Sequence, residues 1–245
     1  MEREPYAWKL DGRRRFERAL WMASALLTVA AAAALVVDIP LARWCQQNFS
    51  WACSLPAASG ARGWQREVAW ALRSAEWFGH GFGVVVISLV IVQLVPKRRW
   101  AIPRIMAVAF GSGLLVDVLK LTIARTRPHS FPLANPDATV WDTFGSWLPL
   151  GGVGSEARSL PSGHAGTAVG LAIALVWLFP RGRWLFPLLA ALVACQRVQS
   201  GAHWLSDVLA GAAVACTFSL FCLGSGPISH ALDRWERQWM HGRKT

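Results

Sequence analysis

Two histidines and a carboxylate lie beside apolar segments of this chain, at spacings that suit catalysis. In the stretch QRVQSGAHWLSD, His203 and Asp207 are four residues apart, so on a helix they share a face. A carboxylate placed there can fix the tautomer of the imidazole and stabilise its positive form, which makes His203 the candidate nucleophile. His164, in the stretch PSGH, is then left to protonate a leaving oxygen.

Cationic and small residues near these histidines suit the binding of a phosphate group. Lys120, Arg127 and Arg197 supply three positive charges, and the planar guanidinium of arginine matches phosphate oxygens. Ser162 and Gly163 precede an apolar run, and their backbone N–H groups at a helix N-terminus would form a seat for an anion. Together these residue types predict chemistry on a phosphate ester.

The composition is that of a membrane protein. Of the 245 residues, 54% are hydrophobic and 16% are charged, which is more apolar and less charged than a typical soluble domain. The chain has 15 Trp and one Tyr, and Trp favours membrane–water interfaces. The net charge of +11 would also suit a nucleic-acid binder, so the placement of the basic residues has to decide between nucleic acid and membrane topology.

Six apolar segments predict an all-α, polytopic membrane protein with six transmembrane helices in one domain, residues 1–245. The first two segments and the sixth are long enough to cross a bilayer. The fourth and fifth are short, because charged or titratable residues enter one end of each. The predicted helices are residues 19–37, 77–95, 102–123, 164–179, 184–198 and 205–223.

The basic residues predict the orientation of the chain. With a cytoplasmic N-terminus, 16 of the 25 Lys and Arg residues lie on the cytoplasmic side, in agreement with the positive-inside rule. This placement accounts for most of the net charge, so we expect no nucleic-acid partner. Residues 1–18 then form a cytoplasmic lead-in, 224–245 a cytoplasmic tail, and 124–163 a long outer loop that carries function. Within the outer segment 38–76, residues 63–77 have the periodicity of a helix that lies along the membrane surface.

The predicted topology brings the candidate residues to one membrane face. Lys120 lies at the outer end of the third predicted helix, and His164 at the outer start of the fourth. Arg197 lies at the outer end of the fifth, and His203 and Asp207 at the outer start of the sixth. We therefore expect an active site at four helix ends, on the periplasmic face of a bacterial inner membrane.

The three motifs, in this order, resemble those of the type 2 phosphatidic acid phosphatase (PAP2) superfamily. They are K-x6-RP from residue 120, PSGH from residue 161 and R-x5-H-x3-D from residue 197. The resemblance implies a membrane lipid phosphatase that needs no metal and no cofactor. It also implies that His203, assisted by Asp207, forms a phosphohistidine, and that His164 protonates the leaving group. The implied phosphate-binding residues are Lys120, Arg127, Ser162, Gly163 and Arg197.

The resemblance leaves the substrate and the fate of the phosphate open. It implies undecaprenyl pyrophosphate, phosphatidylglycerol phosphate, phosphatidic acid and the phosphates of lipid A as candidates, and the basic outer loops fit a pyrophosphate such as the first. A lipid phosphotransferase of the same fold is an alternative that the sequence does not separate from hydrolysis. A non-catalytic membrane transport or binding protein would also use intramembrane charges, but it would not need His164, His203 and Asp207 together.

Several residues near the motifs carry further expectations. Gln196 stands where the third motif of the family usually has Ser, which puts one phosphate contact in doubt. Arg125 and Arg158 are either solvated loop charges or contacts to the substrate headgroup. Cys45 and Cys53 share the first outer segment and could form a disulfide if it faces an oxidising compartment.

For three more polar residues, a structural role is expected or is one of two alternatives. Asp117 lies one turn before Lys120 and is expected to pair with it. His80 is expected to be structural, whereas His129 either touches the substrate or is structural as well. The oligomeric state is left open by the sequence.

Overall fold

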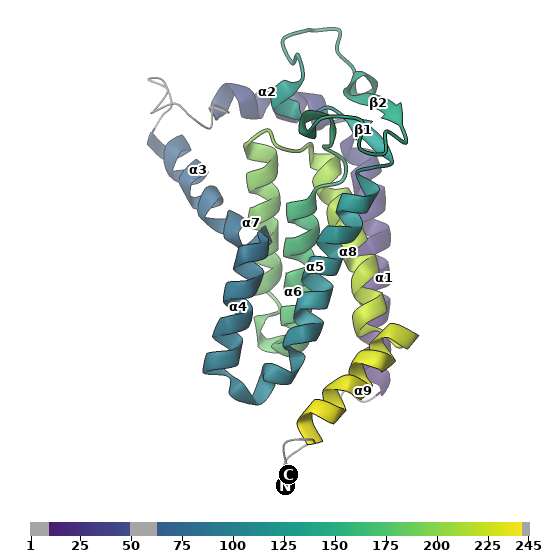
Figure 1. Ribbon diagram of the computed structural model, residues 1–245. Coiled ribbons are helices and arrows are strands. Elements are labelled where there is room, and N and C mark those ends of the chain that lie inside the picture. Colours follow the sequence, from purple (N-terminus) through teal and green to yellow (C-terminus); the bar gives the residue numbers. More distant parts are fainter. Residues whose placement is uncertain (1–9, 50–62, 242–245) are drawn as a thin grey trace.

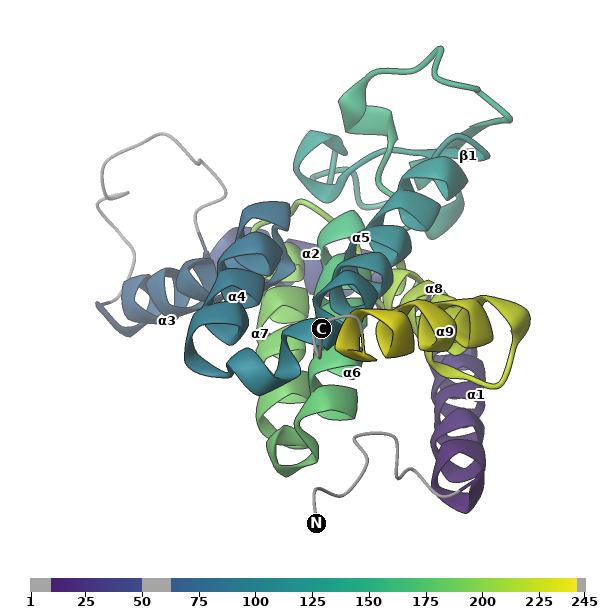
Figure 2. The same ribbon diagram turned by 60° about the horizontal axis from the view of Figure 1, so that its bottom comes forward.

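The computed structural model describes residues 10–49 and 63–241, and shows a bundle of helices with a β-hairpin at one end (Figure 1). We call this the hairpin end, and the opposite end, which α9 crosses (Figure 2), the α9 end. The helices are α1 (Leu10–Ala34), α2 (Asp38–Asn48), α3 (Gly63–Ala75), α4 (Gly81–Leu94), α5 (Ile102–Leu119), α6 (Gly163–Leu178), α7 (Leu185–Gln199), α8 (Leu205–Leu223) and α9 (Pro227–His241). The strands are β1 (Ile123–Arg125) and β2 (Phe144–Trp147).

The predicted transmembrane segments fall on α1, α4, α5, α6, α7 and α8. Within residues 10–49 and 63–241, three stretches are long and apolar enough to cross a membrane, namely Gly12–Ala34, Pro96–Leu119 and Leu205–Leu223. Gly63–Gly79 and Gly81–Leu94 qualify only as a pair, which is bent by 70°. Helices α6 and α7 are apolar but shorter. The mostly helical membrane architecture is thus confirmed, while the number of six crossings stays a prediction.

Some helix boundaries differ from the predicted ones. Helix α5 ends at Leu119 instead of residue 123, because the chain turns there and β1 pairs antiparallel with β2. Helix α4 begins at Gly81 instead of residue 77, because Glu76–Gly79 form a separate 3-10 turn, η1. Helix α1 already begins at Leu10, inside the segment predicted as a lead-in.

The segments outside the predicted spans also have structure. The expected surface helix corresponds to α3, which η1 joins to α4. The predicted outer loop, residues 124–163, combines most of the hairpin with short 3-10 turns, and the predicted tail contains α9. Cys45 is buried in α2, but Cys53 lies outside the described residues, so the disulfide stays untested.

Helix α6 contacts α5, α7 and α8, and small residues allow these close approaches. A Cβ atom at Gly170 would lie 2.9 Å from the carbonyl oxygen of Val108 in α5. A Cβ atom at Gly211 in α8 would overlap the carbonyl oxygen of Ser162, the residue that precedes α6. The close contact at Gly211 fixes the start of α6 against α8, where the candidate residues lie.

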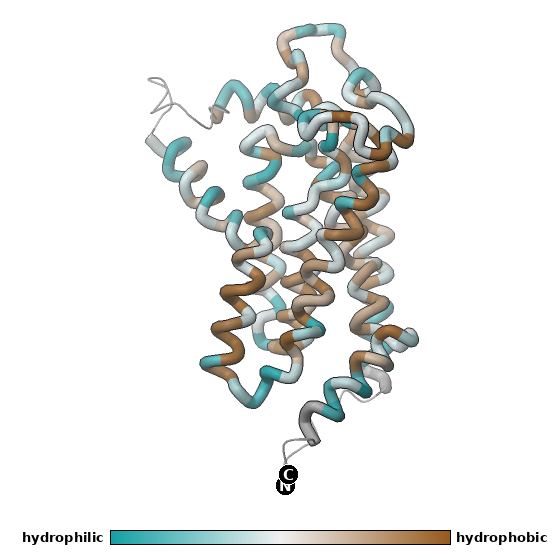
Figure 3. Tube along the Cα trace, in the orientation of Figure 1, coloured by the Kyte–Doolittle hydropathy of each residue, from teal (hydrophilic) through white to brown (hydrophobic). Residues whose placement is uncertain are grey.

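Apolar side chains fill the bundle and also cover its outside. Buried aliphatic residues such as Ile105, Leu171 and Val193 form the core along α5, α6 and α7, where apolar residues dominate (Figure 3). Trp21 and Leu26 of α1 and Leu89 of α4 are exposed instead. Exposed apolar surface of this extent on helices is typical of contact with lipid.

Gly211→Ala tests the contact between α6 and α8. Alanine is intrinsically the better helix residue by up to ~1 kcal/mol, but its Cβ would displace the backbone at Ser162. We expect the detergent-solubilised variant to lose about 1–3 kcal/mol of stability in thermal unfolding. Gly63→Ala is the matched control, because a Cβ there meets no atom within 4 Å. Equal stability of both variants would contradict the close approach.

Candidate active site

The candidate residues gather at the hairpin end of the bundle, where α5 and α7 end and α6 and α8 begin (Figure 1). Lys120 follows α5, His164 lies in the first turn of α6, and Arg197 lies in the last turn of α7. His203 precedes α8, and Asp207 lies in its first turn. His164 is within electrostatic reach of Lys120, Arg197 and His203, so the structure places residues from all four helix ends around one site.

His203 is held by a backbone carbonyl group. The residue is 2% exposed, and its Nδ1 atom lies 2.8 Å from the carbonyl oxygen of Ser159. Because a carbonyl oxygen only accepts, Nδ1 carries the proton and Nε2 is the unprotonated nitrogen of the neutral ring. The turn before His203 needs a left-handed residue, which Gly201 supplies with φ of 68°. The chain therefore presents His203 in the tautomer that a nucleophile requires.

Asp207 orients His203 less directly than its spacing predicts. The carboxylate Oδ2 atom lies 3.8 Å from His203 Nδ1, which is longer than a hydrogen bond. The same oxygen accepts hydrogen bonds from the Ser159 hydroxyl at 2.5 Å and from the Trp204 backbone N–H at 3.0 Å. Asp207 thus fixes Ser159, whose carbonyl in turn holds the imidazole, and adds negative charge near it.

Burial lowers the pKa of His203 below its ordinary value of 6.5. The carboxylate of Asp207 opposes this shift, because it favours the protonated imidazole. The positive charges of Arg127 and Lys120 act in the same direction as burial. The net effect keeps His203 neutral, and its Nε2 lone pair available, at neutral pH.

Arg125 is a member of the site whose role the sequence did not predict. Neither expectation for it holds, because its side chain is fully buried and forms ion pairs with Asp207 at 2.5 Å and with Asp38 at 2.8 Å. Its guanidinium also donates to the hydroxyl groups of Ser206 and Thr143. This single side chain connects α2, the hairpin and the start of α8. No local pattern relates Asp38 to Arg125, so only the fold reveals the cluster.

Glu76 is a member of the site that the sequence did not identify. Its carboxylate accepts a hydrogen bond from Arg197 at 2.6 Å and lies 3.7 Å from Nε2 of His164. It belongs to η1, at the bend between α3 and α4. A carboxylate oxygen thus lies between two of the groups that are expected to meet phosphate.

Gln196 contacts Arg197, the arginine that also pairs with Glu76. Its side chain is buried and accepts a hydrogen bond from Arg197 Nε at 2.5 Å. The longer side chain at the usual Ser position therefore supports Arg197.

The start of α6 has the features expected of a seat for an anion, and the binding itself stays a prediction. A Cβ atom at Gly163 would lie 3.2 Å from Lys120 Nζ, so the ammonium group lies directly beside this helix N-terminus. Lys120 also pairs with Asp117 at 3.1 Å, as expected. The hydroxyl of Ser162 is buried and has no hydrogen-bond partner among the described residues. Such an unpaired buried hydroxyl suits a contact to a phosphate oxygen.

The remaining flanking residues mainly hold the outer segment. Arg127 is half-buried, and its Nε donates to the carbonyl oxygen of Ser155 at 3.1 Å. The two ring nitrogens of His129 lie 2.9 Å from the Gly201 carbonyl oxygen and 2.6 Å from the Glu156 carboxylate, which indicates a structural role. Arg158 donates to the carbonyl oxygen of Gly151.

His80 lies closer to the site than expected. Its ring centroid is 5.9 Å from that of His164. Its Nδ1 accepts the backbone N–H of Phe82, so the side chain caps α4 and keeps the expected structural role. Over residues 10–49 and 63–241, no group of three or more His, Cys, Asp or Glu side chains is placed to hold a metal ion.

Comparison with known proteins identifies the family. Residues 100–227, just over half of the chain, match the family described as the PAP2 superfamily. The chain belongs to the PAP2 superfamily. A crystal structure of a transmembrane PAP2-type phosphatidylglycerolphosphate phosphatase from Bacillus subtilis aligns over 91% of this chain and 96% of that chain, with a TM-score of 0.51. At 17% identity this likeness shows that the two share a fold.

Two curated relatives are similar to this PAP2 protein over shorter stretches. A lipid A 1-phosphatase from Rhizobium johnstonii is 40% identical over 111 residues, which cover 44% of this chain and 41% of the relative. An undecaprenyl-diphosphatase from Sulfolobus acidocaldarius is 28% identical over 138 residues, which cover 54% of this chain and 59% of the relative. The match thus spans less than two thirds of the length of either relative.

Arg125→Met tests the buried cluster of this PAP2 protein. The substitution leaves Asp38 and Asp207 buried without their cation, and breaking a buried ion pair in this way costs about 3–5 kcal/mol. We expect a loss of that size in unfolding of the solubilised protein. Arg158→Met is the matched control, since the side chain of Arg158 is only half-buried and donates to one carbonyl. Similar losses in both variants would refute the special role of Arg125.

Proposed function

We propose that this PAP2 protein hydrolyses a phosphate ester of a membrane lipid through a phosphohistidine at His203. The observation that carries the proposal is the hydrogen bond from His203 Nδ1 to the Ser159 carbonyl, which leaves Nε2 unprotonated. The cations and the N-terminus of α6 around it would bind the phosphate group.

In the first step, the lone pair of Nε2 attacks phosphorus, and the bond from phosphorus to the lipid oxygen breaks. His164 in its protonated form gives its proton to that oxygen, and the Glu76 carboxylate lies 3.7 Å from its Nε2 atom. Lys120, Arg127 and Arg197 stabilise the negative charge that builds on the phosphate oxygens.

In the second step, water attacks the phosphohistidine. One proton of the water passes to His164, the bond between nitrogen and phosphorus breaks, and its electron pair returns to Nε2. Inorganic phosphate leaves, and both histidines regain their starting forms. No step uses a metal ion, so we expect the reaction to proceed in the presence of EDTA.

The substrate we propose is a lipid whose phosphate or pyrophosphate reaches the hairpin end. The relatives named as lipid A 1-phosphatase and undecaprenyl-diphosphatase favour two of the candidates from the sequence, lipid A phosphates and undecaprenyl pyrophosphate. The basic outer segment favours the pyrophosphate. We further propose that the hairpin end faces the periplasm of a bacterial inner membrane, because most basic residues lie toward the opposite side.

The first test measures phosphate release by the detergent-solubilised protein with EDTA present. The panel contains undecaprenyl pyrophosphate, lipid A, phosphatidylglycerol phosphate and phosphatidic acid. We expect His203→Ala to lower kcat by more than about 10³-fold, because the covalent step is lost. His230→Ala, an exposed histidine in α9, is the matched control and should keep full activity. A phosphorylated second lipid in place of free phosphate would identify a phosphotransferase, and loss of activity in EDTA would overturn the metal-free mechanism.

The pH dependence tests the state of the nucleophile. Only neutral His203 can attack, and its pKa lies below 6.5, so acidification to pH 6.5 should leave it mostly neutral. We expect protonation of His203 to lower kcat/KM only below pH 6.5, in a profile measured from pH 4.5 to 8. An acid limb centred above pH 6.5 would show that burial does not control the pKa of His203.

A further inference from the structure

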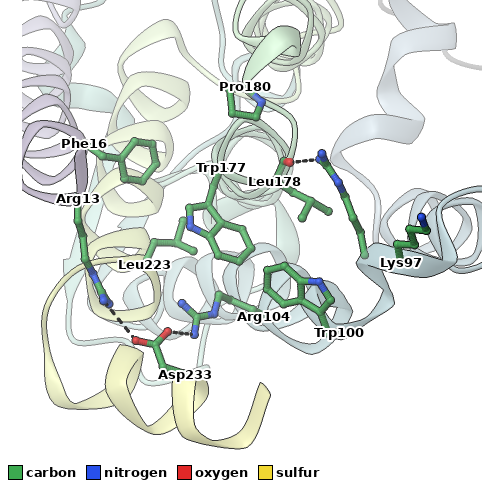
Figure 4. A pocket seen from close by; sticks show the side chains of 11 residues that line it. Arg13, Phe16, Lys97, Trp100, Arg104, Trp177, Leu178, Pro180, Leu223 and Asp233 are labelled. Carbon is green, nitrogen blue, oxygen red and sulfur yellow. Dashed lines mark hydrogen bonds and ion pairs between the residues drawn. The ribbon is translucent and has the colours of Figure 1, made fainter. Parts of the chain in front are cut away.

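A pocket of about 400 Å³ lies at the α9 end of the bundle, opposite His203 (Figure 4). It is enclosed by the start of α1, the turn η2 (Pro96–Ala101) with the start of α5, the end of α6 and α9. None of its lining residues belongs to the proposed reaction. The pocket therefore needs a separate explanation.

Cations dominate the polar part of the lining. Arg13, Lys97, Arg98 and Arg104 line the pocket, against one carboxylate, Asp233. Two of these cations have carboxylate partners nearby, because Asp233 lies 2.6 Å from Arg104 and 3.2 Å from Arg13 (Figure 4).

Arg104 has a further ion pair with the buried Glu236, at 2.7 Å. The surplus positive charge is therefore that of Lys97, which is exposed, and Arg98. Arg98 donates to the carbonyl of Leu178, and its guanidinium lies 4.7 Å from the centre of the Phe179 ring. In Figure 4, Lys97 lies on the opposite side of the pocket from Arg13.

The rest of the lining is apolar and aromatic. Trp100 and Trp177 meet edge to face with ring centroids 5.7 Å apart, and Phe16 and Leu223 extend this apolar part. Trp is enriched where a membrane meets water. Positive charge beside tryptophan, at the end of a membrane bundle, matches a ligand that is anionic at one end and apolar at the other.

We infer that this pocket binds the headgroup of an anionic phospholipid from the membrane leaflet at the α9 end. Lys97 and Arg98 neutralise the phosphate, and the aromatic side chains contact the glycerol and the first carbons of the chains. Basic pockets between transmembrane helices are suited to anionic headgroups. Free inorganic phosphate shares the charge but would make no apolar contact with the tryptophans. The inference goes beyond the proposed hydrolysis and does not depend on it.

The test counts lipids bound to the purified full-length protein by native mass spectrometry. Phosphatidylglycerol is titrated against phosphatidylcholine as the zwitterionic reference. The double variant Lys97→Gln/Arg98→Gln should bind phosphatidylglycerol about 25-fold more weakly, roughly fivefold for each cation removed. The matched control Arg14→Gln/Arg234→Gln removes two exposed cations at the same end, outside the pocket lining, and should bind within about twofold of the native protein.

Several outcomes would overturn the inference. Equal affinity of the Lys97/Arg98 double variant and its control, or equal binding of phosphatidylcholine, would show that the pocket does not select an anionic lipid. Competition by inorganic phosphate as strong as by the lipid would show a simple anion site. If the double variant is unstable, Lys97→Gln alone keeps the test valid, because Lys97 is exposed. This single variant should bind phosphatidylglycerol about fivefold more weakly than the native protein.

Discussion

A buried arginine is tolerated only where carboxylates surround it, and this constraint organises the active-site end of the molecule. Arg125 is fully buried between Asp38 and Asp207, which come from distant parts of the sequence. Removing charges from water is so costly that the three side chains have to meet for any of them to be buried. Their meeting fixes α2 and the hairpin against the first turn of α8. The position of His203, two residues before the first residue of α8, depends on the same contacts.

Both ends of the bundle contain a buried arginine that is held by two carboxylates. At the α9 end, Arg104 is buried between two carboxylates of α9 and attaches that helix to α5. There the excess of positive charge lies beside tryptophan, which suits a lipid headgroup. At the hairpin end the charges surround a neutral imidazole, which suits a reaction. Membrane helices lack a hydrophobic driving force between them, so polar clusters and close packing at Gly170 and Gly211 carry much of their specificity.

Glu76 supplies negative charge to the candidate site. Its carboxylate binds Arg197 and lies near His164, in the region where a phosphate group is proposed to bind. Clustered cations repel one another, and the Glu76 carboxylate offsets part of this repulsion through its ion pair with Arg197. Because Glu76 lies at the 70° bend between the α3 and α4 segments, its position is tied to the shape of the surface helix.

The sequence by itself determined the helical membrane architecture and the set of candidate residues. Apolar runs of bilayer length and the spacing within PSGH and around His203 are local properties, and a single stretch of chain displays them. Only the tertiary structure decided the indirect link from Asp207 through Ser159, the burial of Arg125, and the place of Glu76 at Arg197. Each of these contacts joins residues that are far apart in the chain. Ion pairing and backbone hydrogen bonds leave no periodic trace in a sequence, so they become visible only once the helices have packed.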